Sequence, residues 1–154
     1  MSLNFNEVAK TKLNEVERPP LIPAGPYRWA VIKLAETTTT ADGKWDIVNF
    51  PVRGVEALDG VDEAQLEAFG GATKAISSVR FMFNKEDQAE FDRTLYNLRR
   101  FLENTLQCAT PEMSIAEGLN AAVNQQFIGD VVWKADKQVE GLFHANIGKT
   151  APLS

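Results

Sequence analysis

Few side chains of this 154-residue chain could perform covalent chemistry. Cys108 follows the end of a predicted helix and His144 lies on a predicted strand, and no third group can be assigned that would orient them for nucleophilic catalysis. We interpret them as a buried thiol and a surface imidazole. A single cysteine and a single histidine exclude an internal disulfide and argue against a Cys/His zinc site. Phosphate loops, dinucleotide fingerprints and the HExxH pattern are absent from the sequence. We therefore expect no enzyme, no cofactor and no metal ion.

The distribution of charge is more informative than its sum. The formal net charge of −5 argues against a nucleic-acid partner. Five acidic residues lie between Glu56 and Glu67 with no base among them, without the DxDxDG spacing of a calcium loop, and we interpret them as a solvated helix face. Outside that run, 16 bases balance 16 acids. The predicted strands are locally positive; they hold Arg28, Lys33, Lys44, Arg53, Arg80, Lys134 and Lys149, against Asp46 and Asp130.

One long amphipathic helix is predicted from Asn84 to Gln107, with Asn84 as its N-cap and Asp87 in the capping-box position. Its apolar residues recur at spacings of three and four and form one stripe, made of Phe91, Leu95, Leu98, Leu102 and Leu106. The arginines off this stripe, Arg93, Arg99 and Arg100, are expected to pair with acids along the helix. A second helix follows, starting either at Thr110 with Pro111 or at Ser114 with Glu117.

Strands are predicted on both sides of this helical block. The first, Tyr27–Glu36, has two partly apolar faces, so it is either buried on both sides or bends from one sheet into another. In the second, Trp45–Val55, Pro51 marks an edge or a bulge because it lacks an N–H. The inward residues expected on the second, third and last strands are Val48, Phe50 and Val52 on 45–55, Val79, Phe81 and Phe83 on 78–83, and Phe143, Ala145 and Ile147 on 142–147. A fourth strand is expected near Phe127–Lys134.

This order, three strands, a helical block and two strands, is that of the OB-fold, a five-stranded, partly open barrel. We therefore predict a mainly β, α+β protein with the helical block between strands 3 and 4; a split sheet with helices on one face is the main alternative. The predicted organisation is an N-terminal arm (1–22), a single OB-like domain (23–150) and a short tail (151–154). Inside the domain lie an acidic helical segment (56–71) and helices over 84–107 and 110–126. The arm is either a loosely packed terminus or a segment that packs on a neighbouring subunit.

Three short motifs resemble phage-encoded single-stranded DNA-binding proteins of the OB-fold type. They are PAGPY at 23–27, DGKWDIVNFPV at 42–52 and FIGDVVWK at 127–134, before and after the helical block. The resemblance covers most of residues 20–150 in order and spacing. It implies a protein that coats single-stranded DNA during phage replication or recombination, in the host cytoplasm and often as an oligomer. Many such proteins recruit replication enzymes through an acidic tail, whereas this chain ends in KTAPLS.

OB-fold binders place nucleic acid across strands 2 and 3 and between the loops joining strands 1–2 and 4–5. Aromatic rings stack on bases while lysines and arginines neutralise phosphates. The residues that this geometry selects here are Trp29, Lys33, Lys44, Trp45, Arg53, Arg80, Trp133, Lys134 and Lys137. Trp29 and Trp133 are as readily interpreted as core residues, and Arg53 and Arg80 as solvated cations.

The predicted function is sequence-independent binding of single-stranded DNA by stacking and phosphate neutralisation. Replication or recombination proteins and further copies of the chain remain candidate partners. The alternative is a protein-interaction or structural phage module without nucleic-acid binding. No segment has the hydrophobic length of a membrane span, and the N-terminus lacks a signal-peptide core, so we expect a soluble, cytoplasmic protein without a membrane partner.

Overall fold

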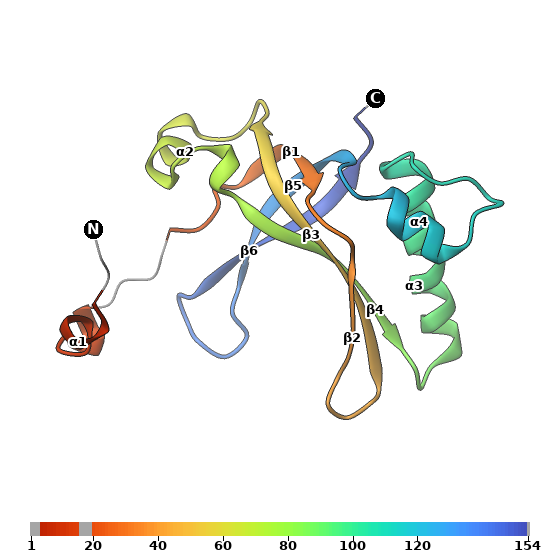
Figure 1. Cartoon of the computed structure of the whole chain (residues 1–154). Coiled ribbons are helices and arrows are strands. Elements are labelled where there is room, and N and C mark those ends of the chain that lie inside the picture. The colour runs from red at the N-terminus through yellow and green to blue at the C-terminus, as the bar shows by residue number, and fades with distance from the viewer. Residues whose placement is uncertain (1–3, 16–19, 154) are drawn as a thin grey trace.

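An antiparallel sheet and a helical block at one end of it make up the fold (Figure 1). The computed structural model describes residues 4–15 and 20–153. In these residues the strands are β1 (Gly25–Val31), β2 (Glu36–Thr39), β3 (Trp45–Ala57), β4 (Ile76–Asn84), β5 (Gln126–Ala135) and β6 (Phe143–Ala151). The α-helices are α1 (Phe5–Val8), α2 (Glu63–Phe69), α3 (Gln88–Arg100) and α4 (Ile115–Ala121). Short 3₁₀ turns cover Leu13–Glu15 and Ala72–Lys74, and a π-helical turn, Phe101–Thr105, continues α3.

The long strand β3 connects the sheet. Along one edge it pairs with β4 from Trp45 to Arg53, and along the other it pairs first with β2 and then with β1. Pro51 lies where this second partner changes, and its carbonyl accepts a hydrogen bond from Ile32 N at 3.0 Å. The missing N–H of Pro51 therefore faces the break between β1 and β2, which agrees with the expected edge or bulge. The predicted first strand is thus two strands, separated at residues 32–35.

The sheet does not close. Its order is β2-β3-β1-β5-β6 with β4 on the free edge of β3, so β4 and β6 are its two ends, and within residues 4–15 and 20–153 no ladder joins them. The mixed α/β class, the antiparallel pairing and the insertion of helices between β4 and β5 agree with the prediction. The five-stranded barrel is not confirmed, because six strands are present and one seam is open.

The inward face of the sheet and the leucine stripe of α3 form the core. Tyr27, Trp29, Phe50 and Phe127 are fully buried, and Leu98, Leu102 and Leu106 nearly so. Phe101 joins the two layers, with its ring 5.2 Å from that of Phe50 and 5.5 Å from that of Phe127. The periodic pattern of the helix therefore predicts its buried side correctly, and Val48, Val79, Phe81 and Phe83 also pack against the core as expected.

Helix boundaries differ from the prediction by a few residues. Asn84 is the last residue of β4, and the N-cap of α3 is Asp87, whose carboxylate accepts a hydrogen bond from Glu90 N at 3.2 Å. Both residues are good caps, and strand pairing with Trp45 determines which one is used. The second helix uses the later start, with a capping box between Ser114 and Glu117.

Two further features complete the fold. The acidic segment forms the short helix α2, capped by Asp62 and ended by Gly70 in the left-handed region, while residues 56 and 57 still belong to β3.

Phe143 is exposed instead of inward, because it lies at the end of β6 beyond the core, whereas Ala145 and Ile147 do pack against the core. Among the described residues, no helix combines the length and apolarity needed to cross a membrane.

Candidate nucleic-acid interface

The outward face of β3 and β4 brings together several of the predicted binding residues. Trp45, Asn49 and Arg53 alternate with the core residues of β3 and therefore share its outward face. Successive members of this row are four residues apart, which corresponds to about 13 Å along a strand. Arg80 on β4 is the register partner of Asn49. The expectation that Trp45, Arg53 and Arg80 lie on one face of the sheet therefore agrees with the strand register.

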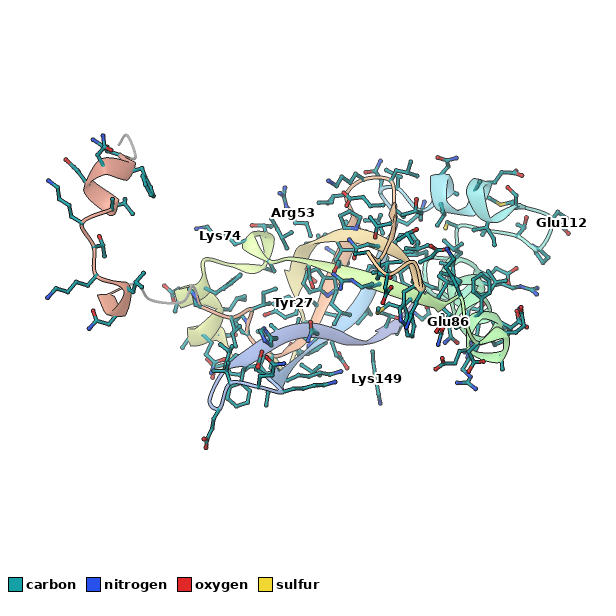
Figure 2. The ribbon with its side chains drawn as sticks, turned by 90° about the horizontal axis from the view of Figure 1, so that it is seen from below. Tyr27, Arg53, Lys74, Glu86, Glu112 and Lys149 are labelled. Carbon is teal, nitrogen blue, oxygen red and sulfur yellow. The ribbon has the colours of Figure 1, made fainter. Side chains whose placement is uncertain are left out.

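Both cations of this face are available to a ligand. Arg53 and Arg80 are exposed, and neither guanidinium makes an ion pair or hydrogen bond with the described part of the chain. Arg53 projects out of the sheet in Figure 2. The exposed apolar side chains of Ile76 and Met82 lie beside them on β4. The face is thus a mixed apolar and cationic surface, which is the composition that single strands of nucleic acid contact.

Trp45 is held at one end of this face by the β2–β3 turn. Its backbone N–H donates to Thr40 Oγ1 at 3.2 Å, and its carbonyl accepts from Thr40 N at 2.9 Å. Its side chain is half-buried, so part of the ring is accessible. Lys44 is exposed in the same turn, where Asp42 accepts its backbone N–H at 3.0 Å. Hydrogen bonds from Thr40 and Lys44 lower the pKa of Asp42, which keeps this carboxylate charged beside the lysine.

The open seam between β4 and β6 contains a polar groove of about 630 Å³, which we call the seam groove. Its floor includes Phe81 and Phe101, and its walls come from β4, β6 and the α3 side of the molecule. Two cations, Arg80 and Arg100, line it together with amide and hydroxyl side chains, and no carboxylate does. The amide and hydroxyl residues are Ser78, Asn97, Asn104, Thr105, Asn146 and Thr150. Because Arg80 belongs to both surfaces, the groove continues the outward face of β3 and β4.

Arg100 and its amide neighbours were not predicted as site residues. The sequence suggested that Arg93, Arg99 and Arg100 pair with acids along the helix, yet among the described residues only Arg99 does so, with Glu103 Oε2 3.0 Å from Arg99 Nε. Arg100 has no such partner in the described residues. The spacing of Asn97, Arg100 and Asn104, three and then four residues, places them on one side of the helix. That polar stripe beside the leucine stripe was the pattern that could have identified the groove.

Trp29 cannot act as a stacking platform in this structure. Its side chain has no exposed surface and lies in the core against Gly129, where an added Cβ would come within 3.0 Å of the indole. Its Nε1 donates to the Gly129 carbonyl at 3.0 Å, which satisfies the only polar atom of the ring. The prediction of Trp29 as a binding residue is therefore corrected, since burial removes both faces of its ring from solvent.

The remaining predicted residues lie apart from the outward face of β3 and β4. Trp133 is 44 % exposed, and by alternation it follows the buried Phe127 and Val131 of β5, so it belongs to the opposite face from Trp45. Its Nε1 donates to the Ile22 carbonyl at 2.8 Å. Lys134 and Lys137 are exposed on the same β5–β6 hairpin. Lys33 is exposed between β1 and β2, and its ammonium pairs with Glu36 at 3.1 Å.

Cys108 and His144, the side chains with potential for covalent chemistry, each contact another group of the chain. Burial raises the pKa of the Cys108 thiol, which contacts the Leu102 carbonyl at 3.6 Å. His144 lies 2.8 Å from Asp136 at the β5–β6 hairpin, and this contact, together with the backbone N–H groups of Gln138 and Val139, lowers the pKa of Asp136 to about 2. No group of three potential metal ligands occurs among the residues described.

Comparison of the sequence with protein-family models and with curated proteins finds no match.

Proposed function

We propose that the protein binds single-stranded DNA across the outward face of β3 and β4 and along the seam groove. The observation that carries the proposal is that Arg80 and Arg100, which form no ion pair with the described part of the chain, lie together in a groove lined by no carboxylate. In a chain with net charge −5, uncompensated arginines that share one concave surface favour an anionic ligand. The sugar–phosphate backbone of single-stranded DNA is an anion that can follow such a surface.

The strand order supports an OB-type architecture as part of the proposal. If β1 and β2 count as one interrupted strand, the chain has five strands, of which the first pairs with the second and the fourth, and the second with the third. The fifth strand, β6, pairs with the fourth and borders the seam groove opposite the third. This pairing supports the interpretation of the sheet as a partly open OB barrel, in which nucleic acid would bind across strands 2 and 3.

Binding would combine stacking with phosphate neutralisation and would break no bond. The accessible part of Trp45 offers a ring at the β2–β3 end of the face. Arg53, Arg80 and Arg100 offer cations along the rest, and the amides of the seam groove offer donors and acceptors to base edges or to phosphate. Together with the resemblance of the sequence motifs, this favours a phage protein that coats single strands in the host cytoplasm during replication or recombination.

The test is a titration of oligo-dT into the protein at low and at high salt, followed by tryptophan fluorescence. We expect quenching from Trp45, because Trp29 is sealed in the core. Three phosphate contacts predict a slope of about −2 for the logarithm of affinity against the logarithm of salt concentration, at about −0.7 per contact for single strands. A Trp45→Phe variant should lose most of the quenching. The absence of any change at micromolar oligonucleotide would contradict the proposal.

A protein-interaction module is the second candidate. The observation that favours it is an apolar groove between α3 and α4, which lies beside exposed Tyr96 and Ile115. Under this alternative the arginines of the seam groove would serve an acidic protein partner, and oligo-dT would leave the fluorescence unchanged.

A further inference from the structure

An exposed tyrosine lies between two arginines on the solvent side of α3. Tyr96 is 58 % exposed. Arg93 precedes it by three residues and Arg100 follows it by four, which are the spacings of neighbours on one side of a helix. Leu98, two residues after Tyr96 and therefore about 200° around the helix axis, is buried in the core. We call Arg93, Tyr96 and Arg100 the α3 ridge.

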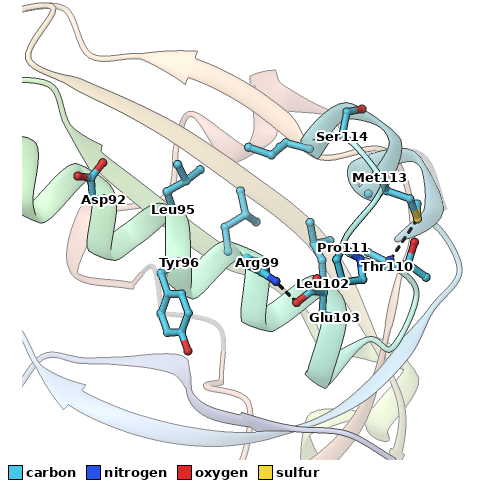
Figure 3. A pocket seen from close by; sticks show the side chains of 14 residues that line it. Asp92, Leu95, Tyr96, Arg99, Leu102, Glu103, Thr110, Pro111, Met113 and Ser114 are labelled. Atoms are coloured by element: carbon cyan, nitrogen blue, oxygen red, sulfur yellow. Dashed lines mark hydrogen bonds and ion pairs between the residues drawn. The ribbon is translucent and has the colours of Figure 1, made fainter.

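The ridge separates two hollows of different chemistry. On one flank it continues into the seam groove, because Arg100 lines that groove together with Asn97. On the other flank an apolar groove of about 450 Å³ lies between α3 and α4, and we call it the α3–α4 groove (Figure 3). Tyr96 borders this second groove, and Figure 3 shows its ring projecting from α3 away from Leu95. The ring is thus accessible beside the seam groove.

Both cations of the ridge are uncompensated. Arg93 and Arg100 are exposed, and neither forms an ion pair with the residues that the structure describes. Glu90, three residues before Arg93, accepts the Asn84 amide at 2.7 Å, which holds its carboxylate at the start of the helix. The ridge therefore presents two positive charges on either side of an aromatic ring.

The remaining charges of α3 favour an approach from the seam groove. Glu103 is neutralised by Arg99 at 3.0 Å. Asp92 lines the α3–α4 groove and accepts the Gln88 amide at 2.8 Å, so its negative charge remains on that flank. An anion is repelled by Asp92 on one flank of the ridge and attracted by arginines on the other.

We propose that single-stranded DNA continues from the seam groove onto the α3 ridge, where one base stacks on Tyr96 and the adjacent phosphates contact Arg93 and Arg100. The alternation of cation, ring and cation matches the alternation of phosphate and base along a single strand. The two arginines are seven residues apart, or about 10 Å along the helix axis, and their flexible side chains can reach phosphates on both sides of one base. This inference rests on the proposed function and adds to it a second stacking residue and a further phosphate contact, both outside the sheet.

The first test compares Tyr96→Ala with Tyr96→Phe. Fluorescence anisotropy measures the affinity of each variant for labelled oligo-dT of about 16 nucleotides, the upper end of the site sizes of single OB folds. We expect Tyr96→Ala to bind about tenfold more weakly than wild type, within the range for one stacked base. Tyr96→Phe keeps the ring and should bind within about twofold of wild type. Because the side chain is mostly exposed, both variants should retain the wild-type circular dichroism spectrum.

The second test compares Arg93→Gln with Arg99→Gln, which change the net charge equally on two sides of α3. Arg93 adds a fourth phosphate contact to those of Arg53, Arg80 and Arg100. At about −0.7 per contact, the slope of the logarithm of affinity against the logarithm of salt concentration should be about −2.8 in wild type and about −2 in Arg93→Gln. Arg99→Gln should keep the wild-type slope, since Arg99 is paired with Glu103.

The outcomes separate this inference from the proposed function. Wild-type binding that Tyr96→Ala does not weaken, or equal losses in Tyr96→Ala and Tyr96→Phe, would overturn stacking on the ridge and leave DNA binding elsewhere intact. A slope that Arg93→Gln leaves unchanged, or changes no more than Arg99→Gln does, would overturn the phosphate contact. A wild-type chain that binds no oligo-dT even at low salt would overturn the proposed function, and the ridge with it.

Discussion

Two hollows border the same helix, and they differ in chemistry. The seam groove on one side of α3 contains Arg100, and the α3–α4 groove on another side contains Arg99. These neighbours in sequence are turned by about 100° around the helix axis. Arg99 is neutralised by Glu103, four residues later, whereas Arg100 faces amides and hydroxyls without an acid. The comparison teaches that the partner of a cation, more than its presence, decides whether a surface attracts an anion.

The largest effect should come from reversing the charge of the seam groove. We expect Arg80→Glu/Arg100→Glu to weaken binding of oligo-dT by at least about 100-fold, because each charge-assisted hydrogen bond contributes about 1.5 kcal/mol or more. The matched control is Arg99→Glu, which changes the adjacent arginine on the other side of α3. Fluorescence anisotropy at constant salt measures both variants. Equal losses in the two would mean that net charge, and not the seam groove, governs binding.

A change on the α3–α4 side should affect stability and not DNA binding. Leu102 is almost fully buried and lines the α3–α4 groove, where an added Cβ on Gly118 would lie 2.9 Å from its Cδ1. We expect Leu102→Ala to lower the free energy of unfolding by about 2–5 kcal/mol, as for other buried leucines. Urea denaturation measures this loss. At urea concentrations where the variant is still folded, its affinity for oligo-dT should stay within about twofold of that of the wild type, because the seam groove lies on another side of α3. A large decrease in affinity would show that the two sides of α3 are coupled.

The two accessible tryptophans allow a finer comparison. Trp45→Ala should weaken binding of oligo-dT by about tenfold, within the 1–3 kcal/mol typical of one stacked base. Trp133→Ala should have a smaller effect, because Trp133 lies on the opposite face of the sheet and donates to the Ile22 carbonyl. Titration of both variants with the same oligonucleotide measures the two losses of affinity. A larger loss for Trp133→Ala would move the binding surface to the β5–β6 hairpin.

The smallest effect concerns pH at that hairpin. The pKa of Asp136 is lowered from 3.8 to about 2, first by its hydrogen bond with His144 and then by the N–H groups of Gln138 and Val139. A lowered pKa means that the charged carboxylate stabilises the folded hairpin above pH 4 and that this contribution is lost as pH falls from about 4 to about 2. We expect the protection of the Gln138 and Val139 amides against hydrogen exchange, relative to the intrinsic rate at each pH, to fall over that interval, with no change near Trp45. In Asp136→Asn this pH dependence should disappear.

Local periodicity accounts for the part of the fold that could be predicted. The spacing of Leu95, Leu98 and Leu102 predicts which side of α3 is buried, and the alternation around Phe50 predicts the inward face of β3. Residues 84–87 show where this reasoning stops. Both Asn84 and Asp87 are suitable caps, and the pairing of Asn84 with Trp45 removed one of them from the helix.

The candidate site could be predicted only in part, for a related reason. Arg53 and Arg80 were identified because strand alternation places each of them on the outward face, which is a local pattern. Trp29 and Trp133 follow similar alternations, yet one is sealed against Gly129 and the other is at the margin of the core. The tertiary surroundings of the two side chains distinguish them, and the pattern of residues along a strand does not contain those contacts.

By itself, the sequence predicted a helical block between two groups of strands, the buried side of α3 and the outward position of two arginines. These follow from periods of 3.6 and 2 residues, which depend on backbone geometry alone. Only the tertiary structure decided that β4 and β6 lie near each other without pairing, that Arg80 and Arg100 share the groove between them, and that Trp29 is enclosed. Each of these depends on contacts between residues far apart in the chain, where packing and strand pairing compete and local preference no longer selects the outcome.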